Sequence, residues 1–335
     1  MKAIVYHNNG SADVLKLQEI EKPVPRDHEV LIKVRAASVN PFDCGMLRHP
    51  FLRRVLATIA KIEITRPGRD VAGEVESVGR NVTQFKPGDD VFGTCSGAFS
   101  EYACARDSAL VMKPLDVSFE QAAAVPVAGL TALQGLRNKG QIQPGQKVLI
   151  NGAAGGVGTF AIQIAKSFGA EVTGVCSTRN VEMVRSIGAD KVIDYTQEDF
   201  TSNGQHYDVI FDLVANHSFS ERRRALDPRG IYIGAGILGR SESIIGLLTY
   251  QITESVLALF ASQKFVSFMT KLNQQDLTAI GALIEEGKVT PVIDRRYRLS
   301  EANEALRHVA EHHARGKVII DFVPTRDLSL NSGEQ

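Results

Sequence analysis

The sequence lacks an excess of charge of either sign, and this absence limits the kinds of partner that the protein can have. Its 335 residues include 38 Lys and Arg and 38 Asp and Glu, so the formal net charge at pH 7 is zero. Proteins that bind nucleic acids or anionic lipids usually carry a basic excess. The balance therefore favours a small molecule, rather than a nucleic acid, as the partner.

Cysteine is scarce as well, and the four that are present form no close pair. They are Cys44, Cys95, Cys104 and Cys176, and no C-x-x-C motif occurs. Small secreted domains that depend on disulfides have more cysteines at closer spacing. The pattern favours a reducing compartment, and we expect no structural disulfide.

Long hydrophobic runs and the features of a secretory leader are also missing. The start "MKAIVYH" passes directly into a strand-like run, without the basic, apolar and cleavage-site series of a signal peptide. The most apolar later stretch, 237–265, is interrupted by Arg240, Glu242, Glu254 and Lys264. None of its uncharged runs reaches the roughly 18 residues that a membrane span needs. We therefore expect a soluble, cytoplasmic protein without a membrane span.

The pattern that is present changes near residue 118. Before this point, short strand-like runs are separated by Pro and Gly, which is typical of an all-β unit. Ser118, with Gln121 three residues later, predicts a capping box at the start of a helix. From Lys147 onward, apolar strands alternate with helical segments, which predicts a parallel, doubly wound α/β sheet. The length also fits two domains better than one core.

Two joints of the alternating region place a glycine where a helix must end. These are Gly169 and Gly188, and we expect both in a left-handed conformation. Near the end of the chain, the strand-like "KVIID" comes after the parallel sheet is complete. We expect this strand to return to the first unit. The predicted domains are therefore a discontinuous first domain, 1–117 and 271–335, and a second domain, 118–270.

The segment "NGAAGGVGTF", 151–160, has four glycines and two alanines within seven residues, between a strand and a helix. Read as Ala153-x-Gly155-x-x-Gly158, it matches a dinucleotide-binding fingerprint. The first small residue permits the tight turn, the second admits a pyrophosphate to the backbone, and the third lets the helix pack on the strand. The helix dipole also favours phosphate. The alternative is a glycine-rich turn without a ligand. We expect a dinucleotide to contact the whole turn, which comprises Gly152, Ala153, Ala154, Gly155, Gly156, Val157 and Gly158.

The end of the next strand indicates which dinucleotide is bound. An NAD site has Asp or Glu about 20 residues after the glycines, where it accepts from the ribose 2′-hydroxyl. Here the stretch reads "VCSTRN" and contains no acid. Ser177, Arg179 and Asn180 instead offer neutral donors and one permanent cation, which suit a 2′-phosphate. We therefore expect NADPH, although Arg179 could also be a solvated arginine at a helix start.

Several stretches together carry a resemblance to a known family. They include "AASVNPFD", "PGRDVAGEVESVG", "FKPGDDVFG", "AAAVPVAGLTALQGL" and the glycine-rich segment itself. Over nearly its whole length the chain resembles the zinc-independent medium-chain dehydrogenases/reductases of the quinone oxidoreductase group, which include chloroplast-envelope quinone oxidoreductase homologues and alkenal/enone reductases. The resemblance implies a GroES-like, β-rich catalytic domain, a Rossmann domain and a cleft between them.

The departures from zinc-dependent alcohol dehydrogenases concern the metal. Where those enzymes have a zinc-binding cysteine, this chain has Asn40, and where they have Gly-His-Glu it has "GRD" at 68–70. The four-cysteine lobe for structural zinc is missing too. His308 and His312 have helical ligand spacing, but they are more typical of a solvated polar face. We therefore expect no metal.

Without zinc, no Lewis acid stabilises the alkoxide that hydride addition to a simple carbonyl creates. A quinone or an α,β-unsaturated carbonyl spreads that charge, and hydrogen bonds can stabilise the resulting oxygen. The resemblance thus implies an NADPH-dependent reductase of hydrophobic quinones or enones. It places Asn40 near the nicotinamide and the substrate, although Asn40 could also be a turn former ahead of Pro41. For the proton, Tyr6, Asp43 and Tyr102 are candidates, and solvent is the alternative.

The resemblance also extends the expected cofactor site beyond the glycine-rich turn. It places Thr131 near the nicotinamide ribose and Tyr195 near the adenosine phosphate. The same expected site includes Leu213, Gly234 and Gly236, at or just after later strands.

Other readings of the sequence stay open. One is an NADPH-binding, redox-sensitive partner protein with little catalysis, while an alcohol dehydrogenase acting on simple aldehydes is disfavoured by the missing zinc ligands. Residues 50–62 have an amphipathic helical pattern, which fits a lid over the cleft better than a membrane-surface helix. The apolar stretch 237–265 fits a substrate wall or a subunit contact. Peripheral membrane contact and a homodimer therefore both stay open.

Overall fold

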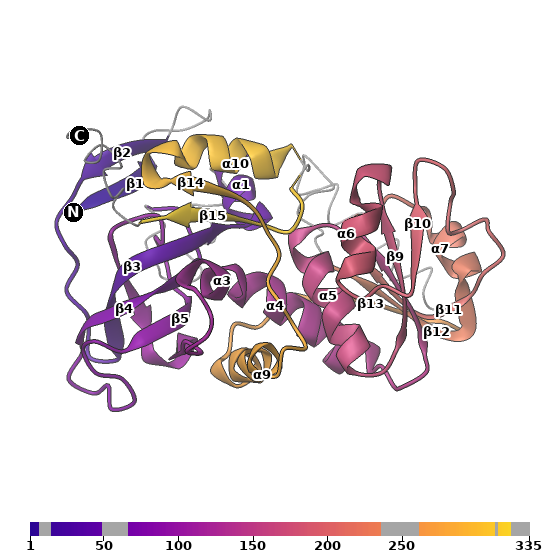
Figure 1. The fold of residues 1–335 in the computed structure, drawn as a ribbon, viewed down its shortest axis with the longest axis horizontal. Helices are drawn as coiled ribbons and strands as arrows, with labels where there is room; N and C mark the ends of the chain where they lie inside the picture. The colour runs from indigo at the N-terminus through magenta and orange to yellow at the C-terminus, as the bar shows by residue number, and fades with distance from the viewer. Residues whose placement is uncertain (7–14, 49–65, 236–260, 312–313, 323–335) are drawn as a thin grey trace, which may run out of the picture.

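The computed structural model describes residues 1–6, 15–48, 66–235, 261–311 and 314–322, which form two sheet-based units side by side (Figure 1). The first unit is mainly antiparallel. Its strands from the N-terminal part of the chain are β3 (Glu29–Val39), β4 (Asp70–Val78), β5 (Asp90–Thr94), β6 (Tyr102–Arg106) and β7 (Leu110–Met112). A separate antiparallel pair joins β1 (Lys2–Tyr6) to β2 (Leu15–Glu19), and the short helix α1 (Pro41–Arg48) follows β3.

Two strands from the C-terminal part of the chain complete this first sheet. They are β14 (Ile293–Arg298) and β15 (Lys317–Asp321), and α10 (Ala302–Ala310) connects them. The sheet order is β14-β15-β3-β4-β5-β7, with β6 paired to β3. β15 runs antiparallel to β3, with Val318 opposite Val39. The C-terminal strand thus lies in the sheet of the N-terminal residues, while the predicted boundaries at 117/118 and 270/271 stay predictions.

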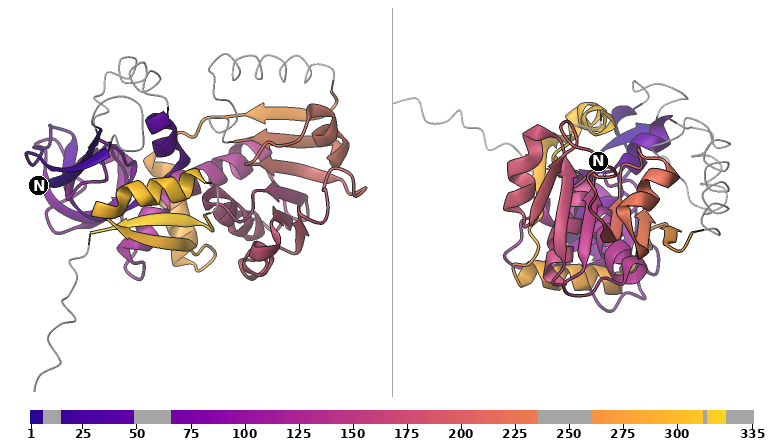
Figure 2. Two further views of the ribbon diagram at one scale, coloured as in Figure 1. Left: turned by 90° about the horizontal axis from the view of Figure 1, so that it is seen from above. Right: turned by 90° about the vertical axis from the view of Figure 1, so that its right-hand side faces the viewer.

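The second unit is a six-stranded parallel sheet with helices on both faces (Figures 1 and 2). Its strands have the order β10-β9-β8-β11-β12-β13. They are β8 (Lys147–Asn151), β9 (Glu171–Cys176), β10 (Lys191–Asp194), β11 (Tyr207–Asp212), β12 (Leu226–Gly234) and β13 (Lys264–Ser267). The helices between them are α5 (Gly156–Ser167), α6 (Val181–Ser186) and α7 (Phe219–Ala225). The predicted combination of a GroES-like unit and a doubly wound parallel sheet is confirmed.

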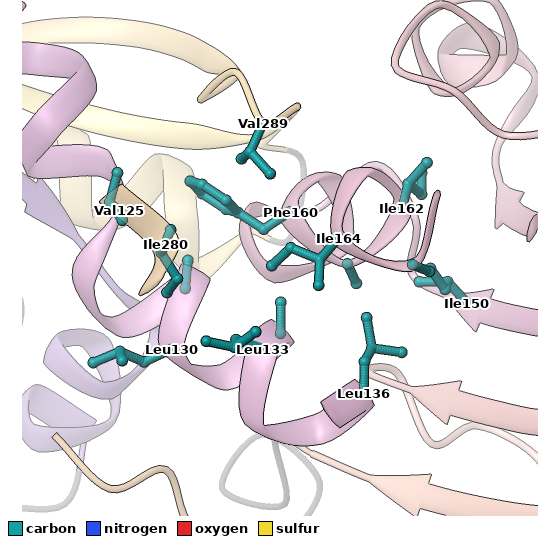
Figure 3. Close-up of a cluster of buried hydrophobic side chains, with 14 of the residues drawn as sticks. Val125, Leu130, Leu133, Leu136, Ile150, Phe160, Ile162, Ile164, Ile280 and Val289 are labelled. Carbon is teal, nitrogen blue, oxygen red and sulfur yellow. The ribbon is translucent and has the colours of Figure 1, made fainter. Parts of the chain in front are cut away.

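Helical segments occupy the junction of the two units. They are α3 (Phe119–Ala124), α4 (Pro126–Leu133), the π-helical continuation η3 (Gln134–Gly140) and α9 (Gln274–Glu285). Buried apolar side chains of α4, α5 and α9 pack together there, with Leu133, Phe160 and Ile280 all at 1% exposure or less (Figure 3). This packing buries the apolar residues of α5 on both sides of Phe160. It fixes the glycine-rich turn, at the start of α5, relative to the first unit.

Local signals at helix ends are present as the sequence predicts. Ser118 and Gln121 form both hydrogen bonds of a capping box at α3. Gly169 and Gly188 have φ angles of 80° and 110°, in the left-handed region where glycine costs least. Three residues then separate α5 from β9, and four separate α6 from β10.

The described residues test only some of the predictions about a membrane. Within the described ranges, no helix combines the length and the apolar character that crossing a bilayer requires. The predicted amphipathic segment 50–62 and most of the apolar stretch 237–265 lie outside those ranges.

Candidate active site

The parallel sheet has its switch point between β8 and β11, where open sheets of this type bind ligands. The winding proceeds from β8 to β9 and β10 on one side, and from β11 to β12 and β13 on the other. The two central strands end at Asn151 and Asp212, which are register partners. The Asn151 Nδ2 donates to the Asp212 Oδ1 over 2.9 Å. The glycine-rich turn follows Asn151 directly and therefore lies at the switch point.

The turn itself differs in one detail from the expectation. The left-handed residue is Gly152, with φ of 86°, rather than Ala153. The Gly152 and Ala153 N–H groups both donate to the Val175 carbonyl, at 3.3 and 3.0 Å. Ala153 is fully buried, and its methyl lies 3.1 Å from where a Cβ on Gly174 would stand. Gly152 therefore makes the tight turn, and Ala153 packs the turn against β9.

The two later glycines of the fingerprint have different surroundings. A Cβ on Gly158 would lie 2.2 Å from the Gly152 carbonyl oxygen, so only glycine lets α5 start this close to the turn. A Cβ on Gly155 would meet only the Gly152 oxygen, at an ordinary 3.4 Å. The side of the turn at Gly155 is therefore open. Because the first N–H groups of a helix have no helical acceptor and carry a positive partial charge, this open side fits a pyrophosphate.

The residues expected at the 2′-phosphate gather at the end of β9. Asn180 Nδ2 donates to Ser177 Oγ over 3.1 Å, and the Asn180 Oδ1 is buried without a hydrogen-bond partner. Arg179, between them, is exposed. The Tyr195 N–H donates to the Cys176 carbonyl over 3.0 Å, which brings the 62% exposed Tyr195 beside this turn. The Ser177 hydroxyl and the exposed Arg179 cation can donate to a ribose phosphate, whereas the Asn180 Oδ1 can only accept and would suit a ribose hydroxyl.

An acid does lie near this turn, but it belongs to the neighbouring strand. Asp194 ends β10 opposite Cys176. Its Oδ1 accepts from the Thr196 N–H at 3.0 Å and the Thr196 hydroxyl at 2.8 Å. Hydrogen bonds, chiefly from Thr178, hold the pKa of Asp194 below its usual value. Asp194 thus fixes the loop that carries Tyr195.

The buried carboxylate of Asp212, which the sequence patterns do not single out, holds the loop around Leu213 in place. The Asp212 Oδ1 accepts from the N–H groups of Val214 and Ala215, at 3.0 and 2.7 Å. Its Oδ2 accepts from the Tyr232 hydroxyl over 2.8 Å. Burial and the adjacent Asp212 raise the pKa of Tyr232, which keeps the hydroxyl proton available for this bond. Asp212 therefore shapes the loop at the end of β11.

Thr131 lies at the other end of the expected cofactor site, in α4. Its hydroxyl lies 2.7 Å from the Thr270 hydroxyl. One turn later, Gln134 pairs with the backbone of Lys271 in both directions, donating to its carbonyl at 2.7 Å and accepting from its N–H at 2.9 Å. These bonds hold the segment after β13 against the helix. Gly234 is the last residue of β12, and Gly236 lies outside the described residues.

Asn40 belongs to a buried polar cluster where β3 passes into α1. The Asp70 Oδ2 accepts from Ser38 Oγ at 2.7 Å, from Asn40 Nδ2 at 2.9 Å and from Lys317 Nζ at 3.3 Å. Its Oδ1 accepts from the Val127 N–H over 3.1 Å, at the start of α4. Lys317 Nζ also donates to Asn40 Oδ1 over 2.7 Å. All four side chains of the cluster are at most 3% exposed.

This cluster adjoins the glycine-rich turn. The Gly316 N–H donates to the Ala154 carbonyl over 2.9 Å. A Cβ on Gly156 would lie 3.0 Å from the Lys317 Cδ. Gly316 and the first residue of β15, Lys317, therefore join the expected phosphate site to the Asn40 cluster. The sequence patterns single out neither Asp70 nor Lys317, although Asp70 is the last residue of the "GRD" motif at 68–70.

Asp43 supports the backbone beside Asn40. Its Oδ2 accepts from the Asn40 N–H at 2.9 Å, and its Oδ1 from the Gly68 N–H at 3.2 Å. Burial raises the pKa of Asp43 to about 6, and the neighbouring Asp70 adds to the rise, against these hydrogen bonds. The carboxylate thus holds the start of α1, and its participation in catalysis stays a prediction.

The position that corresponds to a zinc-binding histidine holds a permanent cation. The Arg69 guanidinium lies 4.9 Å from the centre of the Phe42 ring, and a guanidinium offers no lone pair to a metal. Across the described residues, no group of three or more His, Cys, Asp and Glu side chains could hold a metal ion. His308 instead pairs with Asp294, at 2.7 Å from its Oδ2. The absence of zinc stays a prediction, which Arg69 supports.

The tyrosines proposed as proton donors lie in β1 and β6. Tyr102 is the register partner of Lys33, seven residues before Asn40. An extended strand rises about 3.3 Å per residue, which puts Tyr102 about 20 Å from Asn40. Its ring instead contacts the Lys22 ammonium. Tyr6 ends β1 and pairs with Leu15.

Comparison with known proteins shows which family the chain belongs to. A family model described as an alcohol dehydrogenase GroES-like domain matches residues 26–115, and one described as a zinc-binding dehydrogenase matches residues 187–320. An Arabidopsis thaliana protein named chloroplast envelope quinone oxidoreductase homolog is 34% identical over 339 residues, covering 96% of this chain and 98% of that protein. A chloroplastic NADPH-dependent alkenal/one oxidoreductase of the same plant is also 34% identical, covering 97% and 80%.

A solved structure agrees with these relatives. The quinone oxidoreductase from Coxiella burnetii superimposes with a TM-score of 0.83 at 32% identity, covering 96% of this chain and 99% of that one. A GroES-like unit joined to a parallel sheet with a glycine-rich first turn defines the medium-chain dehydrogenase/reductase architecture. The chain belongs to the quinone oxidoreductase group of that family.

The two glycines of the turn should respond differently to the same substitution. We expect Gly155→Val to keep the fold, because its Cβ enters open space, but to raise the Kd for NADPH at least about tenfold by blocking the phosphate. Gly158→Val should destabilise the protein by several kcal/mol, because its Cβ meets backbone. Melting temperature and NADPH fluorescence titration measure the two effects. Normal NADPH binding by folded Gly155→Val would contradict the position of the phosphate site.

Asp43 should make stability pH-dependent in a defined direction. The folded protein raises its pKa from 3.8 to about 6, so its stabilisation is complete below about pH 4 and is lost as the pH rises through 6. Relative to Asp43→Asn, which does not titrate, the unfolding free energy of wild type should fall by about 1 kcal/mol between pH 5 and pH 7. Urea denaturation at the two pH values measures this difference.

Asp190→Asn is the matched control for that experiment. Despite the cost of burial, hydrogen bonds from Lys166 and Val172 lower the pKa of Asp190, so its contribution is lost only as the pH falls below its unfolded range. The difference between wild type and this variant should be flat from pH 5 to pH 7. A flat difference for Asp43→Asn as well would show that Asp43 titrates normally.

Proposed function

We propose that the protein is an NADPH-dependent reductase that transfers hydride to quinones or α,β-unsaturated carbonyls without zinc. The observation that carries this proposal is the contact between the glycine-rich turn and the Asn40 cluster, made through Gly316 and Lys317. A dinucleotide on the turn would end beside a group of oriented donors. Relatives named as quinone oxidoreductases and as an NADPH-dependent alkenal/one oxidoreductase support the same function.

Different residues around the switch point would contact different parts of the cofactor. The open side of the turn at Gly155 and the start of α5 would hold the pyrophosphate. Ser177, Arg179 and Asn180 would hold the 2′-phosphate, and Tyr195 would lie against the adenosine. At the other end, Thr131 would face the nicotinamide ribose. Leu213 and Gly234 would line the path between these ends.

The chain's own contribution to the reaction is orientation and hydrogen bonding. Bound NADPH supplies a hydride, with its electron pair, to the acceptor. For an enone, a new C–H bond forms at the β carbon, the double-bond electrons shift, and the carbonyl oxygen becomes an enolate. A proton from solvent or an acidic side chain then completes the reduction. A quinone gives a hydroquinone anion in the same way.

A reaction of this kind does not require a metal at Asn40 and Arg69. The developing charge lies on an oxygen that hydrogen-bond donors can stabilise directly. Simple aldehydes lack this delocalisation, so we propose that they are poor substrates. A cytoplasmic location, a homodimer and contact with a membrane surface stay predictions from the sequence.

A panel of acceptors tests the proposed function. We expect NADPH oxidation, followed at 340 nm, with quinones, enals or enones, and little with simple aldehydes. Activity should persist in a chelator, and the purified protein should contain no stoichiometric zinc. Turnover with none of the conjugated acceptors would favour an NADPH-binding partner protein. Activity that is lost in chelator and restored by zinc would contradict the proposed role of Asn40 and Arg69.

Arg179 should carry much of the preference for NADPH over NADH. A charge-assisted hydrogen bond to the 2′-phosphate is discounted here because Arg179 is exposed, so Arg179→Ala should raise the KM for NADPH about tenfold. The KM for NADH should hardly change. The measurement is kcat/KM for both cofactors at fixed ionic strength, because salt screens the contact. Equal losses with both cofactors would show that Arg179 supports the fold or the adenine pocket instead.

A further inference from the structure

The side-chain amide of Asn40 is held in one orientation by two charged neighbours. The Lys317 ammonium can only donate, and it lies 2.7 Å from the Asn40 Oδ1. The Asp70 carboxylate accepts from the Asn40 Nδ2 over 2.9 Å. A flipped amide would put its NH₂ group against the ammonium and its oxygen against the carboxylate. The network therefore determines which amide atom is nitrogen.

This orientation leaves one donor of Asn40 for a ligand. An amide nitrogen carries two N–H groups, and Asp70 takes one of them. Among the described residues, the bond to Asp70 is the one hydrogen bond that the Asn40 Nδ2 makes. Asn40 is only 2% exposed, so bulk water does not replace that acceptor freely. A buried donor of this kind is costly unless an oxygen meets it.

The position of Lys317 shows that the Asn40 side chain lies near the cofactor turn. The Lys317 Cδ lies 3.0 Å from the Cβ position of Gly156, the first residue of α5. The preceding residue, Gly316, bonds to Ala154 of the turn. The lysine side chain therefore runs from the turn to the amide oxygen of Asn40.

We propose that Lys317 is a positioning residue that orients and polarises Asn40, whose second Nδ2–H donates to the acceptor oxygen that becomes negative during hydride transfer. The proposal rests on the function proposed above. The ammonium draws electron density toward the amide oxygen, and this strengthens the N–H groups at the other end of the amide. Asp70, 3.3 Å from the ammonium, balances the buried charge. The polarised amide thus takes the place that a metal ion has in metal-assisted carbonyl reduction.

If Lys317 has this role, its loss should affect the reduction of enones and of quinones to different extents. Hydride addition to a simple enone leaves charge concentrated on one enolate oxygen, which depends strongly on a hydrogen-bond donor. Addition to a quinone leaves an aromatic hydroquinone anion, whose charge is more delocalised and whose oxygen is less basic. Loss of polarisation should therefore slow enone reduction more than quinone reduction. A merely structural role would slow both by the same factor.

The test compares Lys317→Met with wild type, using one enone and one quinone under saturating NADPH. We expect kcat for the enone to fall roughly 10- to 100-fold, the size of one charge-assisted hydrogen bond. For the quinone, the fall should be at least about fivefold smaller, and the Kd for NADPH should change less than about threefold. Lys317→Arg, which keeps the charge, should recover much of the enone rate.

A double variant guards against a failure to fold, and a distant lysine variant serves as the control. Removal of one partner of a buried ion pair is destabilising, so the same rates are measured on Asp70→Asn/Lys317→Met, which removes both charges. Lys191→Met is the control, because Lys191 forms an exposed pair with Glu171 on the parallel sheet and should leave both rates unchanged. Equal losses with both acceptors, or none, in the folded variants would overturn the role of Lys317 while leaving the reductase function intact. A wild-type protein without turnover would overturn both.

Discussion

The buried carboxylate of Asp70 is the interaction on which the rest of the site depends. It is fully buried, and it accepts from a serine, an amide, an ammonium and a helix N–H. Burial of an isolated charge would be prohibitive, so the four donors must come together in the folded state. They come from β3, from the residue between β3 and α1, from the first residue of β15 and from α4. One carboxylate therefore requires the C-terminal strand and the junction helices to be placed together.

Around this polar point the junction of the two units is apolar. Leu133, Phe160 and Ile280 fill it from three helices, and non-directional packing of this kind brings the units together without fixing every angle (Figure 3). The hydrogen bonds of Asp70, and the bond from Gly316 to Ala154, add the directional restraint. The glycine-rich turn and Asn40 are in this way held as parts of one site, although they belong to different sheets.

Local sequence signals predicted much of this fold because their physical causes are local. The capping box at Ser118 and the left-handed glycines at 169 and 188 each need only a few neighbouring residues. The glycine-rich turn was predicted from its place between a strand and a helix, though the left-handed residue is Gly152 rather than Ala153. The assignment of a cofactor to this turn rests on its glycine pattern. In the structure, Gly155 leaves space at the open side of the turn, whereas a side chain at Gly158 would collide with backbone.

The Asp70 cluster could not be predicted in the same way. Lys317 and Asn40 are 277 positions apart, and a lysine ahead of an apolar strand is usually an exposed strand end. Nothing local distinguishes this lysine, because its burial is decided by how β15 pairs with β3. Asp212 was missed for a related reason, since an acid at a strand end gives no sign that it caps the following loop. Only the tertiary structure shows where such charges are compensated.

The pairing of β15 with β3 also has a consequence for the order of events during synthesis. Strands β8 to β12 of the parallel sheet leave the ribosome as one continuous stretch, so they can form a compact body while the chain is still growing. The first sheet must wait, because Asp70 and Asn40 emerge early but Lys317 arrives only after nearly all of the other described residues. Until then the carboxylate stays hydrated, and the edge of β3 stays unpaired on that side. A nascent chain therefore cannot carry a finished site.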